Sequence, residues 1–154
     1  MSTIEARLAE LSLTLPEAAA PAANYVPYVK TGNLVVISGQ ITLENGALKY
    51  VGRVGQDFTT EQAYEAAKLC GLNLIAQLKA ACGGDLERVK RVVRLGGFVN
   101  CTADFTDQPK VINGASDPMA DVFGDIGKHD RAAVGVNTLP LGVAVEVEGM
   151  FEVE

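Results

Sequence analysis

The sequence predicts an α+β protein in which helices cover one face of a single β-sheet. A strand pattern at residues 33–39 precedes a long helix pattern at residues 59–81, and a strand, a second helix and two further strands follow. The long helix has one apolar stripe, so it is stable only against a sheet or another helix. Three observations therefore support this fold class: the order of the elements, the amphipathic helix, and the alternating side chains of the last two strands.

Length and composition fit one domain with a short extension at its N-terminus. The 154 residues are 48% hydrophobic and 21% charged, the balance of an ordinary globular protein. We expect residues 1–24 to form an extension with a short amphipathic helix, and residues 25–154 to form the domain. No apolar run reaches the roughly 20 residues that span a bilayer, and the first residues lack a secretory pattern. We therefore expect a cytoplasmic protein without a membrane partner.

Charge and the metal-ligating residue types disfavour several classes of function. The formal net charge is −6, whereas nucleic-acid binding draws its affinity from lysine and arginine side chains that neutralise phosphates. The basic cluster at residues 88–94 is typical of a solvated strand edge, so a nucleic-acid partner is not expected. The three cysteines, Cys70, Cys82 and Cys101, and the single histidine, His129, lack the spacing of a zinc site. We expect buried thiols, no metal and no cofactor.

The first strands of the domain lie close together in the sequence. Residues 33–39 are rich in β-branched side chains and bounded by glycines, so they predict the strongest strand, and residues 25–29 predict another just before it. The pair Asn45-Gly46 is a hairpin turn signal, and residues 50–54 predict a short edge strand.

The helix at residues 59–81 has clear signals at both ends. Thr59 and Gln62 form a capping box, which satisfies free backbone amides at a helix start. Gly83 and Gly84 supply a left-handed stop after the last turn. Apolar positions recur at three- and four-residue steps on one face, which carries Ala63, Ala67, Cys70, Leu74 and Leu78.

A strand and a second helix follow. Residues 89–99 predict the strand, and residues 111–127 are predicted to be helical in their middle. Ser116 is expected to cap this helix, with Asp117 and Pro118 in its first turn, where a negative charge and a fixed φ are both favourable.

The last two strands are predicted to form a β-hairpin. Residues 131–137 and 143–153 alternate in side-chain character, and residues 138–142 form the turn. The valines of both strands are expected to face the helices. The opposite face then carries Arg131, Ala133, Gly135, Glu146 and Glu148.

This mixed face is the candidate site. Small residues beside an arginine and carboxylates favour close packing of a ligand or a neighbouring subunit, because a solvated strand usually carries larger side chains. Arg131 lies several residues along the hairpin from Glu146, which favours a site shared with a second chain. A structural ion pair between Arg131 and Glu146 or Glu148 is the alternative.

Two motifs carry a resemblance to a known family. The run Arg131-Ala132-Ala133-Val134-Gly135-Val136, followed by Leu139-Pro140 and Val145-Glu146-Val147-Glu148, resembles the closing signature of Rid/YjgF proteins. Residues 32–40 are similar to the strand in which these proteins carry Ser-Gly-Gln, and Tyr25 stands where an aromatic residue precedes it. Residues 113–124 resemble a less characterised branch of the family.

The resemblance implies a chorismate-mutase-like fold with two helices on one face of the sheet, assembled as a homotrimer with sites between subunits. It implies an enamine or imine deaminase that hydrolyses small imino acids of the 2-aminoacrylate type to 2-keto acids and ammonia. Arg131 then binds the substrate carboxylate, for which a two-pronged guanidinium is suited, and Glu146 positions or activates the water. The other residues implied in substrate binding are Tyr25, Ser38, Gly39, Asn113 and Ala133.

Some positions depart from the family pattern. Ala133 replaces a cysteine that the family often carries, so chemistry that depends on a thiol there is lost. Asp130 is a competing partner for the Arg131 guanidinium. The segment around Asn113 is longer than in the better-known branch, so Asn113 is the residue least firmly carried over.

Other positions admit a structural role. Ser38 and Gly39 also fit a plain strand end or bulge, and Tyr25 also fits packing. His129 lies beside the candidate site in the sequence and is assigned no role, although it could titrate there.

Three functions stay open at this point. The first is the deaminase, and the second is a non-catalytic trimer that binds small imino or keto acids, or stabilises proteins, through the same pocket. The third is an endoribonuclease or translation inhibitor, a description long attached to the family. The net charge of −6 and the absence of paired histidines disfavour the third.

Overall fold

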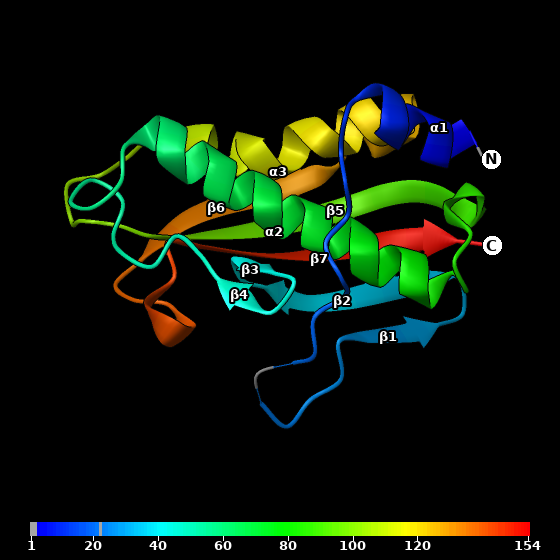
Figure 1. Cartoon of the computed structure of the whole chain (residues 1–154), viewed down its shortest axis with the longest axis horizontal. Helices are drawn as coiled ribbons and strands as arrows, with labels where there is room; N and C mark the ends of the chain where they lie inside the picture. The colour runs from blue at the N-terminus through cyan, green and yellow to red at the C-terminus, as the bar shows by residue number, and fades with distance from the viewer. Residues whose placement is uncertain (1–2, 22) are drawn as a thin grey trace.

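The computed structural model describes residues 3–21 and 23–154; Met1, Ser2 and Ala22, which belong to the predicted extension, lie outside the described residues. Helices α2 and α3 lie over one face of a five-stranded sheet, and the short helix α1 packs against α3 (Figure 1). The predicted α+β class with helices on one face is confirmed. The elements are α1 (Thr3–Glu10), β1 (Tyr28–Thr31), β2 (Leu34–Gln40), β3 (Leu43–Glu44), β4 (Ala47–Leu48), α2 (Thr60–Ala81), β5 (Val89–Asn100), α3 (Gln108–Phe123), β6 (Asp130–Val136) and β7 (Val145–Val153).

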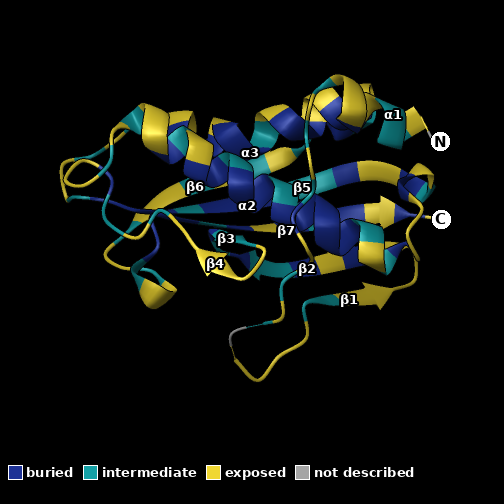
Figure 2. Cartoon of the chain, viewed as in Figure 1, coloured by how far each residue is buried: buried dark blue, intermediate teal, exposed yellow. Residues whose placement is uncertain are grey.

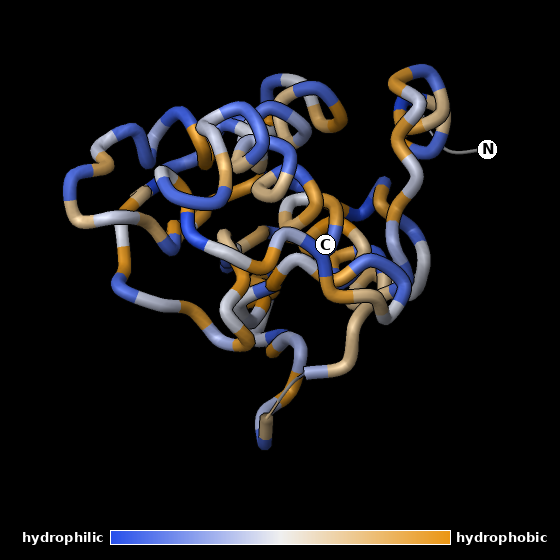
Figure 3. Tube along the Cα trace, turned by 60° about the vertical axis from the view of Figure 1, so that its left-hand side comes forward, coloured by the Kyte–Doolittle hydropathy of each residue, from blue (hydrophilic) through white to orange (hydrophobic). Residues whose placement is uncertain are grey.

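Several local predictions are confirmed. The N-terminal helix forms at the rim of the molecule with hydrophobic and hydrophilic residues side by side (Figure 3), and it buries Leu8. Asn45 and Gly46 adopt positive φ in the hairpin turn between β3 and β4. The first strand begins at Tyr28 instead of residue 25, and residues 50–54 make isolated bridges instead of a strand.

Helix α2 follows its predicted signals. Both hydrogen bonds of the Thr59–Gln62 capping box are present, and Gly83 and Gly84 have positive φ after the last turn. The predicted apolar face is buried, as are all three cysteine thiols. Figure 2 shows α2 buried along most of its middle, with its exposed residues toward the two ends. Within the described residues, no helix has the length and apolar character to cross a membrane.

The last two strands do not form the predicted hairpin. The sheet order is β1-β2-β7-β5-β6, so the long strand β5 lies between them, pairing parallel with β6 and antiparallel with β7. Alternation identifies a strand but not its partner, and this is why the prediction failed. A helix between two strands favours parallel pairing, and α3 stands between β5 and β6 as such a crossover.

Helix α3 begins nine residues earlier than predicted, because its N-cap is Asp107 and not Ser116. It runs from Gln108, with Pro109 in its first turn, so Ser116 is no cap and Pro118 lies inside the helix. An interior proline removes a backbone hydrogen bond, but here packing against α2 compensates. Gly114 lies so close to α2 that a β-carbon there would overlap the Tyr64 carbonyl oxygen. The helix therefore continues through the predicted start point.

The faces of β6 are the reverse of the prediction. Arg131 bonds to residues of α3, and a β-carbon at Gly135 would overlap Gln108 of α3, so these residues face the helices. Val134 points the other way and is 45% exposed. The valines of β7 do face the helices, since Val145 and Val147 are buried. The prediction failed because alternation shows that a strand has two faces but not which of them an edge strand buries.

Candidate functional site

Four of the predicted site residues line one cavity. Tyr25, Ser38, Gly39 and Glu146 surround a space of about 50 Å³ at the end of the sheet near β3. We call it the Glu146 pocket. Its other walls are the N-terminal segment and neighbouring loops, namely Ala19, Ala20, Pro21, Pro27, Gln40, Ile41, Leu43 and Pro140.

The carboxylate in this pocket is half-buried and lies on the backbone of β2. A β-carbon at Gly39 would overlap Glu146 Oε2, so only glycine allows this approach. Burial raises the pKa of Glu146, and the charge of Glu148 raises that pKa further. Within the described chain no hydrogen bond reaches the Glu146 carboxylate. Its environment is therefore that of a carboxyl group suited to accept and return a proton.

A bulge in β2 shapes the wall opposite Glu146. The pairing of β2 with β7 is irregular between Ile37 and Gln40. Ser38 Oγ donates to the Val26 carbonyl oxygen at 2.7 Å, and Gln40 Nε2 donates to the Ser38 carbonyl oxygen at 2.9 Å. The bulge interpretation is correct, and the bulge also turns Ser38 and Gly39 to the pocket.

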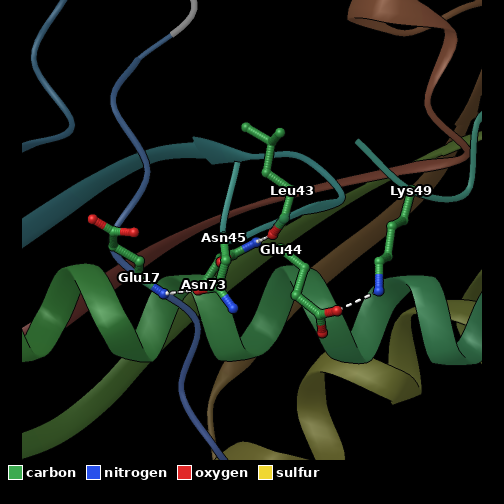
Figure 4. Close-up of polar contacts among 6 residues, drawn as sticks. All are labelled: Glu17, Leu43, Glu44, Asn45, Lys49 and Asn73. Carbon is green, nitrogen blue, oxygen red and sulfur yellow. Dashed lines mark hydrogen bonds and ion pairs between the residues drawn. The ribbon is translucent and has the colours of Figure 1, made fainter. Parts of the chain in front are cut away.

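The N-terminal segment is fixed against the pocket by side chains of other elements. Gln77 of α2 donates to the Ala19 carbonyl oxygen at 2.7 Å. Figure 4 shows Asn45 accepting from the Glu17 backbone amide at 2.9 Å, while Asn73 donates to the Leu43 carbonyl oxygen at 2.8 Å. The extension thus supplies part of the pocket wall instead of only preceding the domain.

Arg131 lies in a second group of residues, between β6 and α3. Arg131 Nη1 donates to Asn113 Oδ1 at 2.9 Å and to Ser116 Oγ at 3.1 Å. Ser116 Oγ also lies 2.9 Å from His129 Nε2, and His129 Nδ1 lies 2.6 Å from the Gly127 carbonyl oxygen. We call Asn113, Ser116, His129 and Arg131 the arginine cluster.

The guanidinium of Arg131 has only neutral acceptors within the described residues. Its third partner is the Pro109 carbonyl oxygen at 3.4 Å from Nη2. Asp130, the expected competitor, pairs instead with Arg94 at 2.9 Å. Glu146 lies on the opposite face of the sheet, so the structural ion pair with Arg131 is ruled out within one chain. The positive charge of Arg131 is therefore left without a carboxylate.

The two groups of predicted residues lie apart in one chain. Across β5, Arg131 is level with Gly149, three residues from Glu146 along β7. Two strand spacings and three residues correspond to about 10 Å in each direction, and the side chains point to opposite faces. Ala133 lies on the Arg131 side and packs against the core. The predicted shared face of Arg131 and Glu146 is therefore wrong.

Sequence reasoning missed Ser116 and His129 as members of the site. The signal was available as two spacings: residues two apart on a strand share a face, and residues three apart on a helix share a side. His129 and Arg131 have the first spacing, and Asn113 and Ser116 have the second. Across residues 3–21 and 23–154, no three histidine, cysteine, aspartate or glutamate side chains gather as a metal site would require.

Comparison with known proteins identifies the family. The profile of the YjgF/chorismate mutase-like endoribonuclease family matches residues 5–152. The chain is 46% identical to protein TCP17 of Trypanosoma cruzi over 150 residues, covering 97% of this chain and 93% of the relative. The chain belongs to the YjgF/chorismate mutase-like family, as its motifs indicate.

Solved structures agree with this assignment. The protein Atu1372 of Agrobacterium tumefaciens, described as of unknown function, superposes with a TM-score of 0.92 at 46% identity, covering 99% of this chain and 93% of that one. RidA from a Psychrobacter species superposes with a TM-score of 0.62 at 26% identity, covering 89% and 94%. The match to Atu1372 therefore covers more of this chain than the match to RidA, and at a higher identity.

Proposed function

We propose that the protein is an enamine or imine deaminase that hydrolyses small 2-imino acids to 2-keto acids and ammonia. The observation that carries the proposal is the Arg131 guanidinium, which is held by neutral acceptors and has no carboxylate partner in the described chain. A guanidinium without an anionic partner in its own chain is suited to bind the carboxylate of a ligand. Its Nε–H and second Nη2–H are left for a carboxylate.

The properties of the Glu146 pocket suit this hydrolysis. Water adds to the imino carbon to give a tetrahedral carbinolamine, and the C–N bond then breaks to release ammonia and leave the keto acid. Glu146 accepts a proton from the attacking water and delivers it to the imino nitrogen; it then relays the carbinolamine hydroxyl proton to the amino group, which leaves as ammonia while the carbonyl forms. A pKa above the usual glutamate value makes the carboxyl group a better base and donor near neutral pH.

A site that combines the arginine cluster with the Glu146 pocket requires a second chain. Arg131 and Glu146 lie on opposite faces of one sheet, and β6 leaves its outer edge unpaired in the described chain. The helix-free face exposes apolar side chains, including Val29, Val36 and Val134, as an interface would. We therefore propose a homotrimer in which the arginine cluster of one subunit approaches the Glu146 pocket of the next.

The proposal is tested by coupling the protein to an enzyme that produces 2-aminoacrylate and measuring release of the keto acid. We expect release well above the rate in buffer, and loss of it in Arg131→Ala. Lys110→Ala removes a positive charge from an exposed position on α3, the helix that packs against Arg131, and is the matched control. Release no faster than in buffer would reject the deaminase.

The same protein distinguishes the alternatives. Calorimetric binding of pyruvate that depends on Arg131, without turnover, favours the non-catalytic carboxylate-binding trimer. Retardation of RNA at low salt favours the endoribonuclease.

Val36→Asp in sedimentation experiments tests the assembly, because a charge on the apolar face should separate the subunits.

A further inference from the structure

The arginine cluster contains a hydrogen-bond chain whose direction is fixed. Arginine can only donate and a carbonyl oxygen can only accept. The Gly127 carbonyl therefore requires a proton on His129 Nδ1, 2.6 Å away. The neutral ring then has a lone pair on Nε2, so the Ser116 hydroxyl donates to it at 2.9 Å. That leaves the Ser116 oxygen free to accept from Arg131 Nη1 at 3.1 Å.

The fold fixes both ends of this series of hydrogen bonds. A β-carbon at Gly127 would overlap the backbone of Met119, so the turn that carries the Gly127 carbonyl lies tightly on α3. A serine inside a helix often bonds to the carbonyl four residues before it, but the hydrogen bonds of the Ser116 hydroxyl lead to His129 and Arg131. The Ser116 hydroxyl therefore bonds to residues outside its own helix.

We infer that His129 and Ser116 are positioning residues for Arg131. They orient the guanidinium so that the edge formed by Nε–H and Nη2–H faces a carboxylate ligand. The inference deepens the proposed function and rests on it for the identity of the ligand. The orientation itself follows from the three distances above and is testable without any ligand.

A role as nucleophile fits the geometry less well. A serine beside a histidine whose other nitrogen is held resembles an activated nucleophile. Here, however, the serine oxygen already accepts a hydrogen bond from the Arg131 guanidinium, which withdraws electron density from it. Labelling of Ser116 by a fluorophosphonate would establish a nucleophile and overturn the positioning role.

The first test reads the imidazole directly. His129 is the single histidine of the sequence, so its ring nitrogens are identified by heteronuclear NMR without assignment. At mildly alkaline pH we expect the proton on Nδ1, the opposite of the form that free imidazole side chains favour. A proton on Nε2 would overturn the inference. Ser116→Ala, which suits a helix, should shift the Nε2 signal and the Arg131 Nε–H signal; an unchanged arginine signal would also overturn it.

The second test uses pyruvate as the ligand. We expect Ser116→Ala to weaken calorimetric binding about tenfold, the effect of losing one hydrogen bond to a charged group. His129→Ala should weaken it by about as much, because it frees the Ser116 hydroxyl that accepts from Arg131. Added imidazole should restore binding to His129→Ala and not to Ser116→Ala, a rescue that a merely structural role does not give. Thermal unfolding checks that both variants fold, and Lys110→Ala is the control. Wild-type protein that fails to bind pyruvate rejects the proposed ligand, whereas the NMR outcome still decides the positioning role.

Discussion

The arginine cluster and the Glu146 pocket are built in different ways. The cluster is held by side chains of α3, of β6 and of His129 just before β6, which bond to one another. The pocket is shaped by backbone: a bulge in β2, a glycine under the carboxylate and a segment of small residues at 19–21. The first arrangement fixes a charge in one direction, and the second leaves space around a carboxyl group.

This difference separates binding from chemistry in the proposed reaction. Changes in the cluster should act on affinity for the carboxylate, because the Arg131 guanidinium has no carboxylate partner among the described residues. Changes in the pocket should act on turnover, because Glu146 is the group placed to move protons. The predictions below test this division, beginning with the largest expected effect.

Arg131→Ala should abolish binding of the carboxylate, and catalytic efficiency should fall with it. We expect a loss of at least about 100-fold in kcat/KM, since a charged, two-pronged contact is removed and the acceptors on α3 lose their donor. Keto-acid release measures the effect. If Arg131→Ala kept the wild-type KM, another residue would bind the carboxylate, and the division between cluster and pocket would be wrong.

Glu146→Gln should lower kcat by about 100-fold, an effect within the range expected for loss of a general base. Its affinity for pyruvate should stay close to that of the wild type. In the wild type the rate should fall as pH decreases, because protonated Glu146 cannot accept a proton. Burial raises the pKa, so the midpoint should lie above the 4.5 usual for glutamate. A pH profile of turnover checks both points.

Gly39→Ala should lower turnover by roughly tenfold, because the new β-carbon displaces the Glu146 carboxylate. Gly32→Ala is the matched control, because nothing lies within 4 Å of a β-carbon there, although its positive φ carries a small cost in stability. Equal effects of the two substitutions on kcat would show that the approach of Glu146 to β2 is unimportant.

The smallest expected effect is a gain in stability for Glu146→Gln. A carboxyl whose pKa is raised in the folded state stabilises the fold only when protonated, and this contribution is lost as pH rises through that pKa. Glutamine should therefore raise the thermal midpoint at neutral pH by a few degrees at most. The gain should vanish below the pKa of unfolded glutamate, which unfolding at two pH values measures.

The parts of the fold that local signals determine could be predicted from the sequence. Thr59 and Gln62 marked the start of α2, and Gly83-Gly84 marked its end. The Asn45-Gly46 turn was found in the same way. In each case the residues that set the conformation are neighbours in the chain.

The parts that depend on partners could not be predicted. The start of α3 was misplaced because Pro118 was read as an N-terminal signal, while packing of Gly114 against α2 carries the helix past it. The faces of β6 were reversed because alternation does not show which side an edge strand buries. Of the site, the residues of the Glu146 pocket were found by motif, but the role of His129 needed the crossover of α3 over β6.

The crossover from β5 through α3 to β6 also bears on the order of folding. The partners of Arg131 lie 18 and 15 residues before it in the chain, so the arginine cluster closes only short loops. Gly39 and Glu146 come from opposite ends of the domain, and contacts of that kind form slowly. The segment from 89 to 136, which contains β5, α3 and β6, should therefore assemble before the Glu146 pocket.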